Sequence, residues 1–107
     1  MNSNSFPKNL YEYIDLTKEK PELYIGSDTI SGMYSHILGY SLACFYKKMN
    51  EVLEPDFTEF HDFVANYYHY NESTAGWKNI ILKENSNDEK KALDEFYRLL
   101  DLFRKKN

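Results

Sequence analysis

Apolar residues recur every three to four positions along most of this chain, and no stretch alternates convincingly between apolar and polar residues. Such a spacing is typical of amphipathic helices rather than of strands. The first apolar stripe extends to about Lys20 and consists of Leu10, Tyr13, Ile14 and Thr17. Pro7 can occupy the first turn of this predicted helix. Pro21 is expected to stop it, because a residue before proline is pushed toward extended geometry.

A short apolar piece, residues 23–25, follows this proline and is expected to be extended. Gly26 should let the chain turn there, since glycine adopts backbone conformations that other residues avoid. Ser27 or Asp28 should then cap the next helix. The sequence therefore predicts a break between its first two long helices.

The segment 29–50 is the longest one with helical periodicity, and it is apolar on two sides. One apolar line consists of Ile30, Met33, Ile37, Tyr40 and Cys44, and the other of Tyr34, Leu38, Leu42, Phe45 and Met49. A helix that is apolar over most of its circumference is normally buried, so we expect this one at the centre of a bundle. A line of small residues would let a neighbouring helix cross closely, and it consists of Ser31, Ser35, Gly39 and Ala43.

The middle of the chain predicts a helix, an aromatic loop and a second helix. The stripe of the first helix consists of Phe57, Phe60, Val64 and Tyr67, and Asp56 or Thr58 can cap it. Residues 68–72 have no sustained period. Residues 73–76 offer a hydroxyl cap to a short helix near Trp77, whose side chain is expected inside the protein.

The last predicted helix begins with a cap at Asn87 or Asp88 and carries bases in its final turn, an order that suits the helix dipole. Its core stripe consists of Ala92, Leu93, Phe96, Leu99, Leu100 and Phe103. Together the segments predict a single domain, residues 1–107, with an all-α fold. The expected architecture is a compact bundle of about five helices with a buried central helix.

Composition supports a folded domain and narrows its environment. Of the 107 residues, 42% are hydrophobic and 17% aromatic, and the net charge is −4. Nucleic acid is not an expected ligand, because phosphate binding needs a basic surface. The single cysteine, Cys44, cannot form an internal disulfide and is expected to be buried. We expect a cytoplasmic protein that makes no membrane contact.

Charge is distributed unevenly along the chain. The acidic residues between positions 51 and 77 are Glu51, Glu54, Asp56, Glu59, Asp62 and Glu72, and this stretch has no Lys or Arg. The whole chain has 17 acidic residues and 13 Lys and Arg, so bases outnumber acids in the remainder. A purely acidic helix face is most often only a solvated face, but one-sided charge also steers association with a basic protein.

No catalytic, metal or cofactor signature accompanies this charge. His61 and His69 are eight residues apart and form no recognised metal-binding motif. Ser73 is the only local candidate nucleophile, with His69 and Glu72 beside it. A helix cap explains this serine more simply. We therefore predict no metal, no cofactor and no enzymatic activity.

The aromatic loop adds a second feature that favours protein binding. Tyrosine and tryptophan supply large contact areas with few rotatable bonds and dominate binding hot spots. The side chains of Tyr68, His69 and Tyr70 cannot all point inward from one short loop, so some should be presented. The predicted partner-binding set is Glu51, Glu54, Asp56, Glu59, Asp62, Tyr68, His69, Tyr70 and Glu72.

Several segments together resemble a group of small bacterial helical proteins. The segments are 59–64 (Glu-Phe-His-Asp-Phe-Val), 67–68 (Tyr-Tyr), 71–77 (Asn-Glu-Ser-Thr-Ala-Gly-Trp), 80–82 (Ile-Ile-Leu), 88–89 (Asp-Glu) and 92–97 (Ala-Leu-Asp-Glu-Phe-Tyr). Members are often immunity proteins found beside polymorphic or contact-dependent growth inhibition toxins. The resemblance implies a cytoplasmic inhibitor that blocks one cognate toxin domain, and many such toxins are basic nucleases. The alternative is a small-molecule or regulatory binding domain whose aromatic loop lines a pocket.

Overall fold

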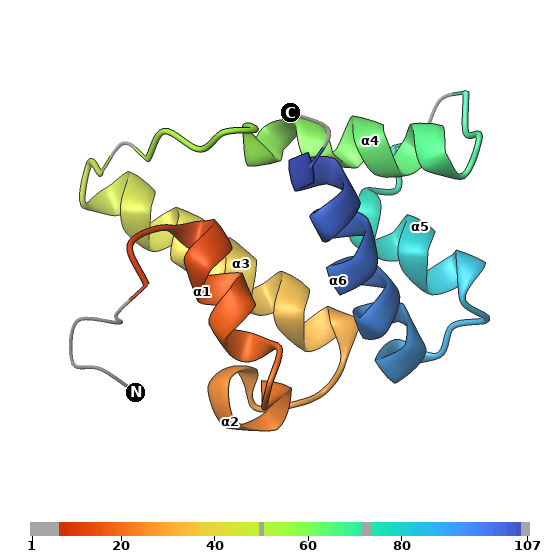
Figure 1. Ribbon diagram of the computed structural model, residues 1–107, viewed down its shortest axis with the longest axis horizontal. Helices are drawn as coiled ribbons and strands as arrows, with labels where there is room; N and C mark the ends of the chain where they lie inside the picture. The colour runs from red at the N-terminus through yellow and green to blue at the C-terminus, as the bar shows by residue number, and fades with distance from the viewer. Residues whose placement is uncertain (1–6, 50, 72–73, 106–107) are drawn as a thin grey trace.

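The computed structural model describes residues 7–49, 51–71 and 74–105, and all regular structure in these ranges is helical (Figure 1). The elements are α1 (Leu10–Thr17), α2 (Pro21–Ile25), α3 (Ile30–Tyr46), the 3-10 helix η1 (Phe57–Glu59), α4 (Phe60–Tyr67), α5 (Trp77–Glu84) and α6 (Glu89–Lys105). The predicted all-α fold of about five helices is therefore confirmed.

Helix α6 supplies the centre of the core. Every residue of its predicted apolar stripe is buried, and the helix packs against α3, α4 and α5. The rings of Phe60, Trp77 and Phe96 contact one another, with centroids 5.0 to 5.7 Å apart. The predicted burial of Trp77 is confirmed, and these ring contacts hold α4 and α5 against α6.

Helix α3 is buried along only its first half, so the prediction of a buried central helix is wrong for this segment. Ile30, Met33 and Ile37 face the core. The second half extends away from α5 and α6, toward the left of Figure 1. Only one of the two apolar lines can face α6, and the second line is exposed at Leu38, Leu42, Phe45 and Met49. Cys44 is consequently half-buried rather than buried.

The segment after α1 is helical, so the prediction of an extended piece is wrong. Pro21 is the first residue of α2, a position where its missing N–H would have no helical partner in any case. Gly26 follows α2 with a φ of 80°, which confirms the predicted turn. The cap of α3 is Thr29, whose hydroxyl accepts a hydrogen bond from Gly32 N at 3.0 Å, rather than either of the two residues before it.

Three of the four small residues in the line on α3 lie open, whereas Ser31 donates from its N–H and its hydroxyl to the Glu89 carboxylate of α6. Ser35, Gly39 and Ala43 are exposed, and a Cβ added to Gly39 would meet no atom within 4 Å. The prediction that this line permits a close helix crossing within the chain is therefore wrong. The crowded glycine is Gly32, where an added Cβ would lie 2.3 Å from Ser27 Oγ.

Two of the predicted caps, those of η1 and α6, are confirmed. Asp56 caps η1, and Asp88 caps α6 by accepting a hydrogen bond from the backbone three residues later. Helix α5 has Gly76 as its N-cap, with a φ of 85° and no side-chain hydrogen bond. The N-cap position is therefore not a hydroxyl residue, and the predicted cap at Ser73 lies outside the described residues.

Candidate functional site

Four of the predicted carboxylates lie on η1 and its flanking segments, and we call this surface the acidic face. It consists of Glu54, Asp56, Glu59 and Asp62, all of which are exposed. The face follows the upper edge of Figure 1, from the chain before η1 into α4. Phe60 and Val64 are buried in the same segment, and this amphipathic arrangement leaves Glu59 and Asp62 in solvent.

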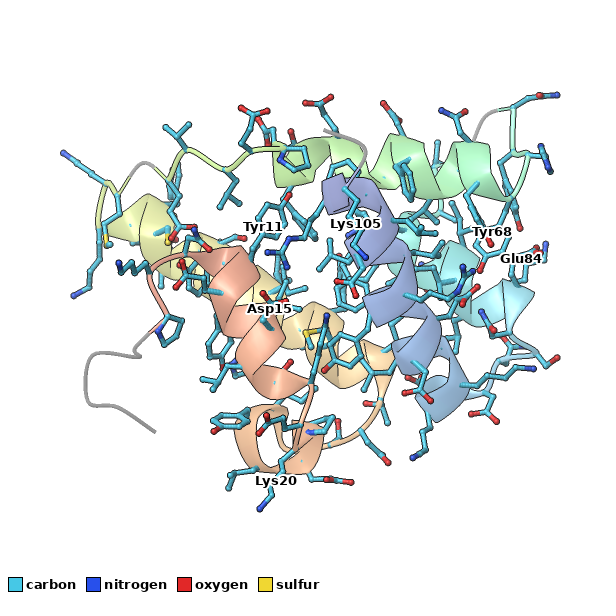
Figure 2. The ribbon with its side chains drawn as sticks, in the orientation of Figure 1. Tyr11, Asp15, Lys20, Tyr68, Glu84 and Lys105 are labelled. Carbon is cyan, nitrogen blue, oxygen red and sulfur yellow. The ribbon has the colours of Figure 1, made fainter. Side chains whose placement is uncertain are left out.

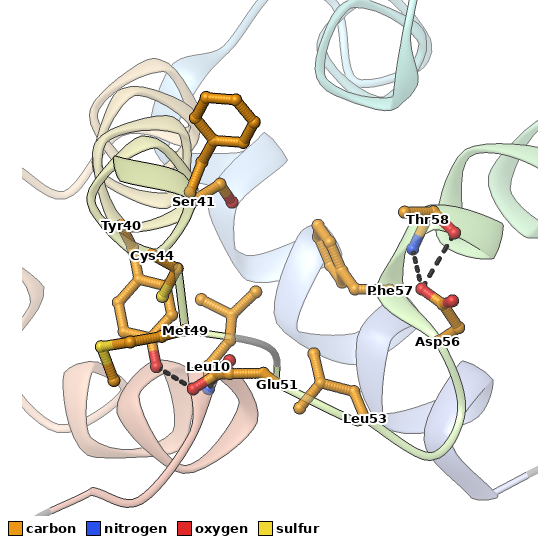
Figure 3. Close-up of a pocket in the computed structure, with 11 residues that line it drawn as sticks. Leu10, Tyr40, Ser41, Cys44, Met49, Glu51, Leu53, Asp56, Phe57 and Thr58 are labelled. Carbon is orange, nitrogen blue, oxygen red and sulfur yellow. Dashed lines mark hydrogen bonds between the residues drawn. The ribbon is translucent and has the colours of Figure 1, made fainter. Parts of the chain in front are cut away.

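The Asp56 side chain is exposed to solvent and also caps η1. Its Oδ1 accepts hydrogen bonds from Thr58 N at 3.0 Å and from Thr58 Oγ1 at 2.9 Å (Figure 3). These bonds hold the pKa of the Asp56 carboxyl below its usual range, because they favour the charged form. The carboxylate is therefore ionised at neutral pH and fixed in direction.

Three carboxylates of the acidic face act on the buried side chain of Tyr11, whose hydroxyl donates to the Pro55 carbonyl. The pKa of Tyr11 is raised to about 12, chiefly by burial, with Arg104 acting to lower it and these three carboxylates to raise it. The Arg104 guanidinium lies 4.8 Å from the centroid of the Tyr11 ring. Figure 2 shows Tyr11 beside the last turn of α6, which Lys105 marks. The acidic run therefore has Arg104 near it in space. The local sequence does not reveal this neighbour.

Glu51 holds three segments of the chain together. Its side chain is half-buried, and Oε1 accepts a hydrogen bond from Leu10 N at 3.3 Å. Oε2 accepts one from the Tyr40 hydroxyl (Figure 3). Burial and this bond raise the pKa of Tyr40. The sequence predicts a displayed charge at Glu51, and the structure corrects this, because the carboxylate is used internally to join α1 and α3.

The aromatic loop is bonded back to α5 and α6. The Tyr68 hydroxyl donates to Glu95 Oε2 at 3.0 Å, and the Tyr70 hydroxyl donates to Glu84 Oε2 at 2.9 Å. Burial and the Glu95 carboxylate raise the pKa of Tyr68, and the bond to Glu84 raises that of Tyr70. Both tyrosines are half-buried, whereas His69 is exposed with a φ of 64°. Of the three side chains, His69 is the one most fully presented to solvent.

The predicted partner-binding residues therefore do not form a single site. In Figure 2 Tyr68 and Glu84 lie at the right of the molecule, well away from Tyr11 beneath the acidic face. The loop and the acidic face lie toward opposite ends of α4, and Glu72 lies outside the described residues.

Beside the acidic face lies a groove that the sequence did not predict. It runs between the second half of α3 and residues 51–58, with a volume of about 340 Å³ (Figure 3). Its lining consists of Leu10, Tyr40, Ser41, Cys44, Phe45, Met49, Glu51, Leu53, Asp56, Phe57 and Thr58. The sequence placed Phe45 and Met49 in the core. A helix with two apolar sides carries no local sign of which side stays open.

The described ranges give less support to a metal site or a nucleophilic site. No three His, Cys, Asp or Glu side chains gather there as metal ligands. Of the candidate nucleophile and its two neighbours, only His69 belongs to the described part of the chain. The same ranges contain no helix long and apolar enough to cross a membrane.

Known proteins provide no closer guide to this site. No protein-family model, curated protein or solved structure matches the chain. The resemblance to immunity proteins stays a prediction. Function is therefore inferred from the chemistry of the acidic face and the groove.

Proposed function

We propose that this protein is an immunity protein that binds a basic toxin domain and neutralises it without catalysis. The observation that carries the proposal is the acidic face, whose four carboxylates are exposed on one continuous segment. Residues 51–71 and 74–77 contain no Lys or Arg. The complementary partner for such a surface is a basic protein.

A surface with charge of one sign accelerates encounter with a protein of the opposite charge. Complementary surfaces raise association rate constants from about 10⁵–10⁶ to as much as about 10⁸–10⁹ M⁻¹s⁻¹ at low salt. Arg104 weakens the negative potential at the edge next to α6, since it shares the surroundings of Tyr11 with three of the carboxylates. Asp62 is not one of these three carboxylates and lies farther along the segment, so we expect it to contribute most to steering.

A nuclease is the favoured class of toxin. Nucleases bind a polyanion and need Lys and Arg around the phosphate-binding surface. Four carboxylates in a row resemble the charge of that substrate, so the acidic face can occupy the same basic surface. Inhibition then follows from exclusion of the nucleic acid, and the inhibitor needs no catalytic residue.

The proposal is tested by protection of growing cells. The gene beside this one should encode a large secreted protein with a variable C-terminal domain, and that domain should be toxic when expressed alone. Co-expression of the wild-type chain should restore growth, whereas the triple variant Glu54→Lys, Glu59→Lys and Asp62→Lys should not. Glu19→Lys combined with Glu22→Lys reverses exposed charges outside the acidic face, and this control should protect.

Circular dichroism must show that the triple variant is folded. Full protection by a folded triple variant would exclude the acidic face as the toxin-binding surface. A wild-type chain that binds no basic domain encoded beside it would contradict the proposed function itself.

A further inference from the structure

The second half of α3 and the turn after it carry an exposed apolar stripe. Its residues are Leu38, Leu42, Phe45 and Met49, which are 48%, 49%, 74% and 57% exposed. Scattered apolar side chains are normal on protein surfaces, but a continuous apolar patch is typical of an interaction site. The spacing of the first three residues places them on one side of the helix.

The end of the apolar stripe, Phe45 and Met49, borders the groove. Phe45 and Met49 line the groove from the side of α3, and Leu53 and Phe57 line it from the facing segment. Asp56 lies next to Phe57 in this second wall (Figure 3). The groove therefore combines large apolar contacts with an ionised carboxylate whose direction is fixed by its hydrogen bonds to the backbone and side chain of Thr58.

The charges around the groove identify what can occupy it. Asp56 and Glu59 are exposed on the side of η1, and Lys47 and Lys48 are exposed in the turn that follows α3. An occupant must therefore place its bases toward η1 and its apolar side chains between the two walls. An amphipathic α-helix with Lys or Arg along one flank meets both requirements.

A second copy of this chain is a poorer occupant. The helix Ile30–Tyr46 contains no Lys or Arg, so a copy packed stripe to stripe could offer Asp56 only the two bases of the turn, Lys47 and Lys48. Each copy also has a net charge of −4, and like charges oppose association. The charge pattern thus favours a basic partner over self-association.

We infer that the groove binds an amphipathic α-helix of the toxin domain. Large apolar side chains of that helix insert between Phe45 and Phe57, and its Lys or Arg residues face Asp56 and Glu59. The inference rests on the proposed function and names the element by which the toxin is held. Burial of the apolar side chains slows dissociation, whereas the acidic face speeds encounter.

A synthetic helical peptide provides the probe. We choose an 18-residue peptide of Leu and Lys, with Leu at helical spacing along one side, and measure its binding by fluorescence anisotropy. Wild-type protein should bind it. Phe45→Ala should weaken binding about tenfold or more, because a central aromatic anchor is lost, and Asp56→Asn should reduce its salt dependence. Leu23→Ala alters a side chain that is 69% exposed on α2, and this control should bind like wild type.

Three results would overturn the inference. One is equal binding of the peptide by wild type and by folded Phe45→Ala. Another is equal binding of a peptide with the same composition but no helical period. The third is a wild-type dimer, detected by analytical ultracentrifugation, that Phe45→Ala dissociates, since a second copy would then occupy the groove.

The cognate toxin domain separates this inference from the proposed function. If Phe45→Ala binds that domain like wild type while the triple charge reversal does not bind, the groove proposal fails and the proposed function survives. If both variants bind like wild type, neither the groove nor the acidic face is the toxin-binding surface. If wild type itself does not bind the domain, the proposed function fails. Faster dissociation of Phe45→Ala, with little change in its association rate, is the result that supports both.

Discussion

Carboxylates of one acidic run have different roles at the scale of single residues. Asp56 caps η1, and Asp62 faces solvent, but Glu51 is bonded to Leu10 and Tyr40. The cap could be predicted because it depends on residues immediately beside it in the sequence. The role of Glu51 could not be predicted, because its partners are 41 and 11 positions away.

Replacing Glu51 with Ala should lower the free energy of unfolding by about 1–3 kcal/mol, since part-buried donors on Leu10 and Tyr40 lose their acceptor. Urea unfolding followed by circular dichroism measures this loss. Glu54→Ala changes an exposed neighbour and should stay within about 0.5 kcal/mol of wild type. Equal losses in the two variants would show that Glu51 does not hold these segments together.

Glu95 should make the protein sensitive to acid. The Arg98 guanidinium holds the pKa of the Glu95 carboxyl below its usual range, and the Tyr68 hydroxyl acts in the same direction. Because the folded pKa is the lower one, this stabilisation is fully present above the unfolded value of about 4.3. It is lost as pH falls through the folded pKa. Wild type should therefore lose more stability than Glu95→Gln between about pH 5 and pH 3.

Urea midpoints at both pH values measure the difference between the two proteins. Asp94→Asn is a suitable control, because it removes an exposed carboxylate from the same helix. The same acid sensitivity in wild type and Glu95→Gln would mean that the Arg98 contact does not stabilise the folded chain.

At the scale of elements, the number of apolar sides determines how much the sequence reveals. Helix α6 has a single apolar stripe, so its buried residues could be predicted correctly. Helix α3 has two apolar lines, and the sequence predicts the helix without showing which line is covered. The five residues of α2 are too few to display a helical period. From the sequence, Pro21 is expected only to stop the preceding helix. In the structure it also begins the next helix.

Two glycines of α3 should respond differently to the same substitution. Gly39→Ala should raise the free energy of unfolding by about 0.5–1 kcal/mol, because the added methyl group meets open space and alanine favours the helix. Gly32→Ala should give a less stable protein than Gly39→Ala. Its methyl group would displace Ser27 Oγ from the hydrogen bond with Thr29 Oγ1. Thermal and urea unfolding of both variants would detect the difference, and the opposite order would contradict the packing described for α3.

At the scale of the whole molecule, helical periodicity predicted the architecture and charge predicted the acidic face. The contacts that organise the candidate site come from distant parts of the chain. Arg104 approaches Tyr11 from the last helix, and Glu84 and Glu95 bind the tyrosines of the aromatic loop. Local sequence patterns do not encode such pairs. The same limit explains why the groove became visible only in the folded structure.

The central claim is that the acidic face steers a basic toxin domain. Glu59→Lys combined with Asp62→Lys should leave folding nearly unchanged, because exposed charges contribute little to stability. Glu19→Lys combined with Glu22→Lys is the matched control. It makes the same change in net charge at exposed positions around α2, at the lower edge of Figure 1 and across the molecule from the acidic face.

The most direct measurement is the association rate constant of each protein with the cognate toxin domain at low and high ionic strength. The reversal at Glu59 and Asp62 should slow association about tenfold or more at low salt, and the difference should shrink at high salt as the charges are screened. The control should associate nearly as fast as wild type. If the Glu59 and Asp62 variant associates as fast as wild type at low salt, or if the control slows equally, the acidic face is not the recognition surface.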